Sequence, residues 1–182
     1  MIFRDITEKK KKSALIDYHS HYDLVTGFSN CEGLTIQLKE MLGDLKDKNI
    51  EHTLLELEID RFSEITAEAG IRGTQEILKQ FAEILRSQIQ QKDIAARISE
   101  DIFIFALRDC SIRDALHVAG RINVAISNRI FKYQGLEFPL SVSIGLVALS
   151  EERRNIETLL RSAKTACNWA KREEESRIFC FT

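Results

Sequence analysis

The chain has 182 residues, of which 44% are hydrophobic and 30% are charged, and its formal net charge is −2. This length and composition fit one compact domain with an ordinary core. Because the charge shows no basic excess, we expect neither nucleic acid nor a membrane surface as a partner of this domain. No apolar run approaches the roughly 20 residues of a membrane span and no signal-like leader is present, so we expect a cytoplasmic domain, with any membrane anchor of the full-length protein elsewhere.

Residues 1–22 are polar and carry a lysine run at positions 9–12, which indicates a solvated helical lead-in or linker. Apolar residues at helical spacing then predict a helix from Leu34 to Leu45. The later periodicities predict a strand at 55–59, a helix at 77–89, strands at 94–98 and 102–107, a helix at 115–126, a strand at 140–146, a helix at 156–170 and a short strand at 178–181.

From Thr53 to Leu149 this order is β-α-β-β-α-β, which predicts an α/β (α+β) fold of the ferredoxin-like palm type, with a mainly antiparallel sheet flanked by helices. Right-handed crossovers make the first two strands parallel and place the third antiparallel between them. Glu58, at the end of the first strand, should therefore lie beside the turn that contains Glu100 and Asp101.

Two carboxylates at such an edge suit a hard cation such as Mg²⁺, which typically serves substrate phosphates. Acidic residues at strand ends and in turns are more often solvated surface, and the pattern alone favours that interpretation. The four cysteines have no CxxC pair and no neighbouring histidine ligands, which argues against a zinc site and a disulfide framework: Cys31, Cys110, Cys167 and Cys180.

Four motif-like segments favour a functional interpretation of these carboxylates over a solvated surface. They read DLVTGFSN at 23–30, LEIDRF at 57–62, ARISEDIF at 96–103 and SIGLVA at 143–148. In this order they resemble the DxLTGLxNR, LDIDxFK, ARxGGDEF and SIGxA motifs of the GGDEF family of diguanylate cyclases. The resemblance predicts a GGDEF-like domain at 23–182. Residues 1–22 contain a DITE sequence similar to the tail of PAS sensor domains, which predicts excision from a longer PAS-GGDEF or PAS-GGDEF-EAL protein.

The resemblance implies condensation of two GTP molecules into cyclic di-GMP across a symmetric dimer, with Mg²⁺ in each half-site. It places the metal ligands at the carboxylates of Glu58 and Asp101 and at the backbone carbonyl of Ile59. The signature itself departs from GGDEF, because it reads Ser99, Glu100, Asp101, Ile102, Phe103.

The two signature glycines supply positive φ and close approach to phosphate, which Ser99 and Glu100 do not. Glu100 also brings a carboxylate to the place of a triphosphate, and Ile102 cannot ligate a metal. No catalytic residue is therefore assigned in the signature.

The nucleotide-binding positions implied by the family also change. Ser63 replaces a phosphate-contacting Lys, and Thr66 and Gln75 replace the guanine-reading Asn and Asp. Lys171 still matches the family's late phosphate-contacting Lys. The family's inhibitory RxxD site reads QQKD, so Asp93 is retained while Gln90 replaces the Arg that grips cyclic di-GMP.

The sequence therefore predicts a degenerate, catalytically inactive GGDEF domain with a regulatory, dimerisation or GTP-sensing role beside PAS or EAL domains. Binding of GTP or cyclic di-GMP is expected to be weak, with Mg²⁺ needed only if nucleotide binds. An active cyclase and a cyclic di-GMP receptor are alternatives. A ferredoxin-like nucleic-acid binder is disfavoured because no basic stripe is present.

Overall fold

The computed structural model describes residues 20–45, 50–149, 155–173 and 177–181. Residues 1–19, most of the expected lead-in, lie outside this description. The elements follow in the order α2 (Cys31–Asp44), β1 (His52–Ile59), α3 (Phe62–Gln88), β2 (Ile94–Arg97), β3 (Ile102–Leu107), α4 (Ile112–Ser127), β4 (Ile130–Tyr133), β5 (Leu136–Pro139), β6 (Val142–Leu149), α5 (Ile156–Ala170) and β7 (Ile178–Phe181).

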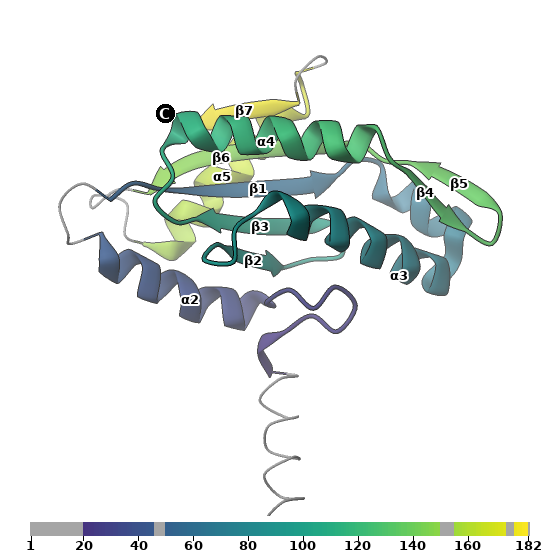
Figure 1. Ribbon diagram of the computed structural model, residues 1–182, viewed down its shortest axis with the longest axis horizontal. Coiled ribbons are helices and arrows are strands. Elements are labelled where there is room, and N and C mark those ends of the chain that lie inside the picture. The colour runs from purple at the N-terminus through teal and green to yellow at the C-terminus, as the bar shows by residue number, and fades with distance from the viewer. Residues whose placement is uncertain (1–19, 46–49, 150–154, 174–176, 182) are drawn as a thin grey trace, which may run out of the picture.

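A five-stranded sheet in the order β2-β3-β1-β6-β7 forms the centre of the molecule (Figure 1). Its neighbouring strands are antiparallel except for β6 and β7, which are parallel. β3 lies between β1 and β2 and is antiparallel to both, as right-handed crossovers require. The predicted α/β fold, with a mainly antiparallel sheet and flanking helices, is confirmed.

Helices cover both faces of the sheet. Leu55 and Leu57 of β1 belong to the apolar cluster formed with α3 and α4. Leu54 belongs to the second cluster, formed with α2 and α5. Because side chains alternate along a strand, Glu56 and Glu58 share the side of Leu54. The acidic positions of β1 therefore lie on a face that helices cover.

Helix α3 is longer than the sequence predicted. It begins at Phe62 instead of Ile77, and it is kinked at Gly70, where φ is 66° and ψ is −179°. The kink interrupts the helical period, and Ile71 beside it is 82% exposed. The apolar pattern of the first half therefore does not continue into that of the second, which is why periodicity located only the second half.

The β4–β5 hairpin was not predicted. Gln134 and Gly135 form its turn with φ values of 49° and 82°, a backbone in which both central residues are left-handed. Phe131 and Phe138 face each other across the two strands and are buried in the core. These strands are only four residues long, which gives too few alternating positions for a pattern to stand out.

The 23–30 segment is fixed to the strand that leads into the β2–β3 turn. Ser29 donates its N–H to the Ala95 carbonyl at 3.0 Å and accepts from the Arg97 N–H at 2.8 Å. The Asp23 carboxylate accepts hydrogen bonds from the N–H and hydroxyl of Thr26 at 2.8 and 2.6 Å. It also pairs with Arg97, at 3.2 Å. This motif therefore has a structural role in holding β2.

The Asp23→Ala variant is expected to lower the free energy of unfolding by about 2 to 3 kcal/mol. It removes the bonds to Thr26 and leaves the largely buried Arg97 guanidinium without its carboxylate. Chemical denaturation measures the change. Glu76→Ala is the control, because it removes an exposed pair with Lys79 and should cost less than about 1 kcal/mol. Equal losses in the two variants would contradict this role of Asp23.

Candidate functional site

The end of β1 meets the β2–β3 turn at one edge of the sheet. Glu58 lies opposite Ile102 in the β1–β3 register. The N–H of Ile59 donates to the carbonyl of Asp101 at 3.0 Å. The structure therefore brings together the backbones of the three residues expected to hold a metal, Glu58, Ile59 and Asp101.

The turn itself is built from Ser99, Glu100 and Asp101. None of these three residues has a positive φ. Ile98 donates its N–H to the Ile102 carbonyl at 3.0 Å and closes the turn. The turn therefore forms without the left-handed backbone that glycines favour.

The last two signature residues lead into the core. Ile102 is half-buried, and Phe103 is completely buried. The Phe103 ring packs against those of Phe28 and Phe81, with centroid separations of 6.2 and 5.2 Å. Phe103 therefore has a packing role.

Arg97 fixes the position of the turn. Its Nη2 donates to the Glu100 carbonyl at 2.7 Å, while its Nη1 contacts Asp23. The Glu100 backbone is thereby held in place while its side chain remains exposed. The backbone of Glu100 is thus fixed at the sheet edge, where its side chain is exposed.

A cavity of about 450 Å³ lies between this turn and the kinked part of α3. Thr66, Gln75 and Glu100 line it, together with Gly70 at the kink. Two of the four expected nucleotide-binding residues therefore share a cavity with the acidic turn residue. Ser63 is exposed on α3, outside the lining of this cavity.

Lys171 lies beside Glu58 instead of in that cavity. It is the C-cap of α5, and its Nζ donates a hydrogen bond to Glu58 Oε1. Burial lowers the pKa of Lys171, but the hydrogen bond and charge of Glu58 outweigh this effect and raise the pKa above its usual value. Lys171 is therefore a cation whose charge Glu58 balances.

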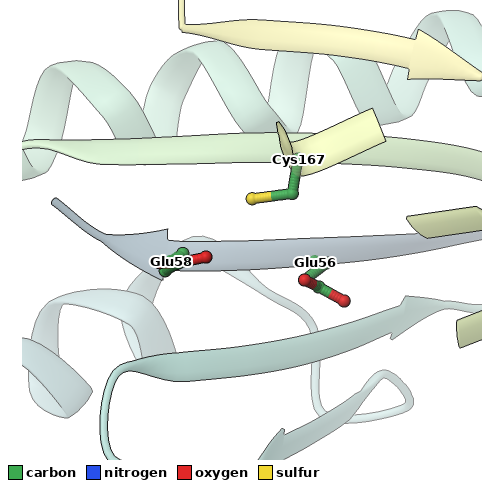
Figure 2. Close-up of side chains that lie close together, drawn as sticks. All are labelled: Glu56, Glu58 and Cys167. Carbon is green, nitrogen blue, oxygen red and sulfur yellow. The ribbon is translucent and has the colours of Figure 1, made fainter. Parts of the chain in front are cut away.

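A second group of donors lies next to this ion pair. A carboxylate oxygen from each of Glu56 and Glu58 and the Cys167 sulfur lie within 4.8 Å of one another (Figure 2). Burial raises the pKa of Glu56 to about 7, helped by Glu58 and opposed most strongly by Lys164. Burial also raises the pKa of the Cys167 thiol to about 12. The thiol donates to the Ser143 carbonyl at 3.3 Å.

The two residues of the expected inhibitory site, Gln90 and Asp93, lie close together at the far end of β2. The Asp93 carboxylate accepts from the N–H groups of Gln90 and Arg108, at 2.8 and 3.0 Å. Both residues line a cavity of about 320 Å³, to which Arg108 and Arg121 also contribute. The Asp93 carboxylate is therefore already used to order the backbone around this cavity.

Four residues of these sites were not predicted from the sequence: Glu56, Cys167, Arg108 and Arg121. The position of Glu56 in the middle of a predicted strand was a signal available in the sequence. A carboxylate at such a position is buried when a helix covers that face of the sheet. Cys167 carried no such signal, since only packing brings it to β1. The two arginines lie on separate elements, and no spacing rule joins them to Asp93.

None of the helices in the described part of the chain combines the length and the apolar composition that a membrane span needs. Residues 20–177 match the family described as "Diguanylate cyclase, GGDEF domain". The chain is 24% identical over 178 residues to "Probable diguanylate cyclase DgcE" of Escherichia coli K12, covering 98% of this chain and 16% of that protein. It is 27% identical over 163 residues to "Diguanylate cyclase TpbB" of Pseudomonas aeruginosa, covering 89% and 38%. The chain thus spans well under half the length of these relatives.

The fold is also similar to a solved structure, the coiled coil and GGDEF domain of DgcB from Caulobacter crescentus in complex with c-di-GMP. The TM-score is 0.88 with 15% sequence identity, over 98% of this chain and 95% of that one. The family match covers strands β1 to β6, the β2–β3 turn and the helices that line the cavities, and ends before β7. The chain belongs to the GGDEF family, the diguanylate cyclase domains of cyclic di-GMP signalling.

Proposed function

We propose that this domain does not condense GTP itself and acts as a regulatory module in cyclic di-GMP signalling. The observation that carries the proposal is that Glu100, whose backbone Arg97 holds in place, lines the same cavity as Thr66 and Gln75. By family resemblance, a glycine at this position allows the backbone to approach the phosphates of GTP. A carboxylate there repels a triphosphate and adds bulk where glycine has none.

Other replacements weaken the same site. Ile102 has no group to hold a metal or move a proton, where the family has an acid. Ser63 lacks the charge of a phosphate-contacting Lys, and Gln75 lacks the carboxylate that reads guanine. Removing one charge-stabilising group commonly lowers a rate by about 10²- to 10³-fold. Such losses are not additive, but together they support a domain without measurable turnover.

The expected Mg²⁺ site fits in part. Oxygen donors suit this ion, and the backbones of Glu58, Ile59 and Asp101 meet at the sheet edge. The Glu58 carboxylate is nevertheless paired with Lys171. We therefore propose that Glu58, Asp101 and the Ile59 carbonyl hold Mg²⁺ only with a nucleotide, whose phosphates attract Lys171 and complete the ligand set. Bound Mg²⁺ would neutralise phosphate charge.

As a regulatory module, the domain would bind GTP weakly, associate as a homodimer and pass a signal between PAS and EAL domains of a longer protein. The chain's 16% share of DgcE is consistent with such a multidomain setting. Nucleotide binding would stabilise one arrangement of the sheet edge, and the neighbouring domain would respond to it.

Titration calorimetry with GTP and Mg²⁺, followed by chromatography of the same sample, tests this proposal. We expect weak binding and no cyclic di-GMP. Asp101→Ala should weaken binding by about tenfold or more, because a charge-assisted contact is lost. Glu100→Gly should strengthen it, because the repulsive carboxylate is removed. Product would establish an active cyclase, and absence of both binding and product would refute the GTP-sensing role.

A second candidate function is binding of cyclic di-GMP in the cavity at Gln90 and Asp93. Arg108 and Arg121 favour it, because guanidinium groups recognise phosphates by paired hydrogen bonds. The relative DgcB was solved with this dinucleotide. Calorimetry with cyclic di-GMP should show weak binding that Arg121→Ala abolishes and Gln90→Arg strengthens. Binding that is insensitive to both changes would rule out this cavity.

A further inference from the structure

Glu56 is a buried acid in the middle of a sheet. Its side chain is only 3% exposed, and it pairs in register with Ile104 on one side and Gly145 on the other. Its Oε1 atom is buried and has no hydrogen-bond partner. A buried oxygen without a partner costs about 1–3 kcal/mol, more if it is charged. This position therefore lacks a group that would satisfy a carboxylate.

Cys167 reaches the same place from α5. The helix packs directly against Gly145 of β6, where an added Cβ would lie 2.6 Å from the Ala163 carbonyl oxygen. This close approach brings the Cys167 side chain toward β1, over the strand that carries Glu56 and Glu58 (Figure 2). Two carboxylates and a thiol from two elements thus converge within 4.8 Å.

The chemistry of these three donors indicates which metal ion would fit between them. Thiolate sulfur combined with carboxylate oxygen suits a borderline divalent cation, and among these Zn²⁺ accepts both types in a four-coordinate site. Mg²⁺ prefers oxygen donors alone. Each glutamate side chain has three rotatable bonds, so the two carboxylates can close on an ion without movement of the strand.

The surrounding charges are compatible with a bound cation. Two ionised carboxylates, one thiolate and a divalent ion sum to −1, and two nearby ammonium groups offset this negative charge: Lys171 beside Glu58, and Lys164, whose charge acts on Glu56. The Cys167 thiol would release its proton to solvent on binding, as thiols do when they ligate metals.

We propose that Glu56, Glu58 and Cys167 form a zinc-type metal site between β1 and α5. Three protein donors leave the fourth position of a tetrahedron for water. The site shares Glu58 with the proposed Mg²⁺ site but needs neither Asp101 nor a nucleotide. It therefore does not depend on the proposed regulatory function. It links the sheet to α5, so metal binding would stabilise the packing of this helix.

Titration of the reduced, purified chain with Co²⁺, a spectroscopic substitute for Zn²⁺, tests the site. We expect one equivalent to bind with a thiolate-to-cobalt charge-transfer band, and Zn²⁺ to displace it. Cys167→Ser should abolish the band. Glu56→Gln, which preserves side-chain shape, should weaken Co²⁺ affinity by more than about tenfold, since even outer-shell partners are worth 10- to 100-fold.

Two controls separate this site from others. A variant with the remaining cysteines replaced by Ser at positions 31, 110 and 180 should keep the band. Asp101→Ala should also keep it, because Asp101 belongs to the turn. Absence of the band in the wild-type chain, its survival in Cys167→Ser, or undiminished affinity in Glu56→Gln would each overturn the proposal. If Cys167→Ser does not fold, the Glu56→Gln affinity decides.

Discussion

The Gly145→Ala variant is expected to lose about 3 kcal/mol or more of unfolding free energy, which corresponds to a fall in Tm of about 6–12 °C. A Cβ at this position would lie 2.6 Å from the Ala163 carbonyl oxygen and still closer to the Cys167 amide nitrogen. Both obstacles are backbone atoms of α5, so no side-chain rotation can relieve the overlap. The helix has to move away from β6, which opens the packing of Ala163 and Ala166.

Gly120→Ala is the matched control. Gly120 lies within α4, and an added Cβ there meets nothing within 4 Å. Because Ala is the better helix former, this variant should gain about 0.5–1 kcal/mol. Urea denaturation of both variants gives the comparison. A Gly145→Ala protein as stable as wild type would mean that α5 does not pack on β6 as described.

The second large effect is the pH dependence of folding stability that Glu56 causes. Burial raises its pKa from 4.5 to about 7 in the folded protein. The folded state therefore holds this proton more tightly than the unfolded state. Burial of the ionised carboxylate therefore lowers the stability of the folded protein in a pH-dependent way. This loss of stability is absent below about pH 4.5, grows between pH 4.5 and 7, and is constant above pH 7. The difference between the two pKa values corresponds to about 3 kcal/mol.

Glu56→Gln removes the ionisation and keeps the shape. We expect its stability relative to wild type to increase by about 3 kcal/mol between pH 4.5 and pH 8, measured by denaturation in metal-free buffer. Glu83→Gln, on the exposed face of α3, is the control for an acid-to-amide replacement. A stability difference between Glu56→Gln and wild type that does not change with pH would show that Glu56 is solvated.

The order of elements was predictable because helix and strand periodicities differ clearly in most of the chain. Leu55, Leu57 and Ile59 alternate along β1, and the apolar residues of α4 and α5 recur at helical spacing. The kink at Gly70 broke this signal in α3. For the β4–β5 hairpin, the Gln134–Gly135 pair was a signal available in the sequence, because a glycine favours a left-handed turn.

The site was predictable only where the topology itself brings residues together. The crossover rule predicted that Glu58 and Asp101 would meet, because strand order determines their separation. The proximity of Glu56 to Cys167 instead depends on how closely one helix approaches the sheet at Gly145. The pairing of Lys171 with Glu58 is equally a matter of side-chain packing, which periodicity does not describe.

Formation of cyclic di-GMP is the measurement that decides whether this GGDEF domain is a regulator or an enzyme. The purified wild-type chain would be incubated with GTP and Mg²⁺, and the products would be separated by chromatography. A variant in which Ser99 and Glu100 are replaced by Gly and Ile102 by Glu would be treated in the same way. We predict no cyclic di-GMP from the wild-type chain, whether or not the variant gains activity. Cyclic di-GMP that accumulates with wild-type protein and disappears in Asp101→Ala would contradict the regulatory role and establish a working cyclase.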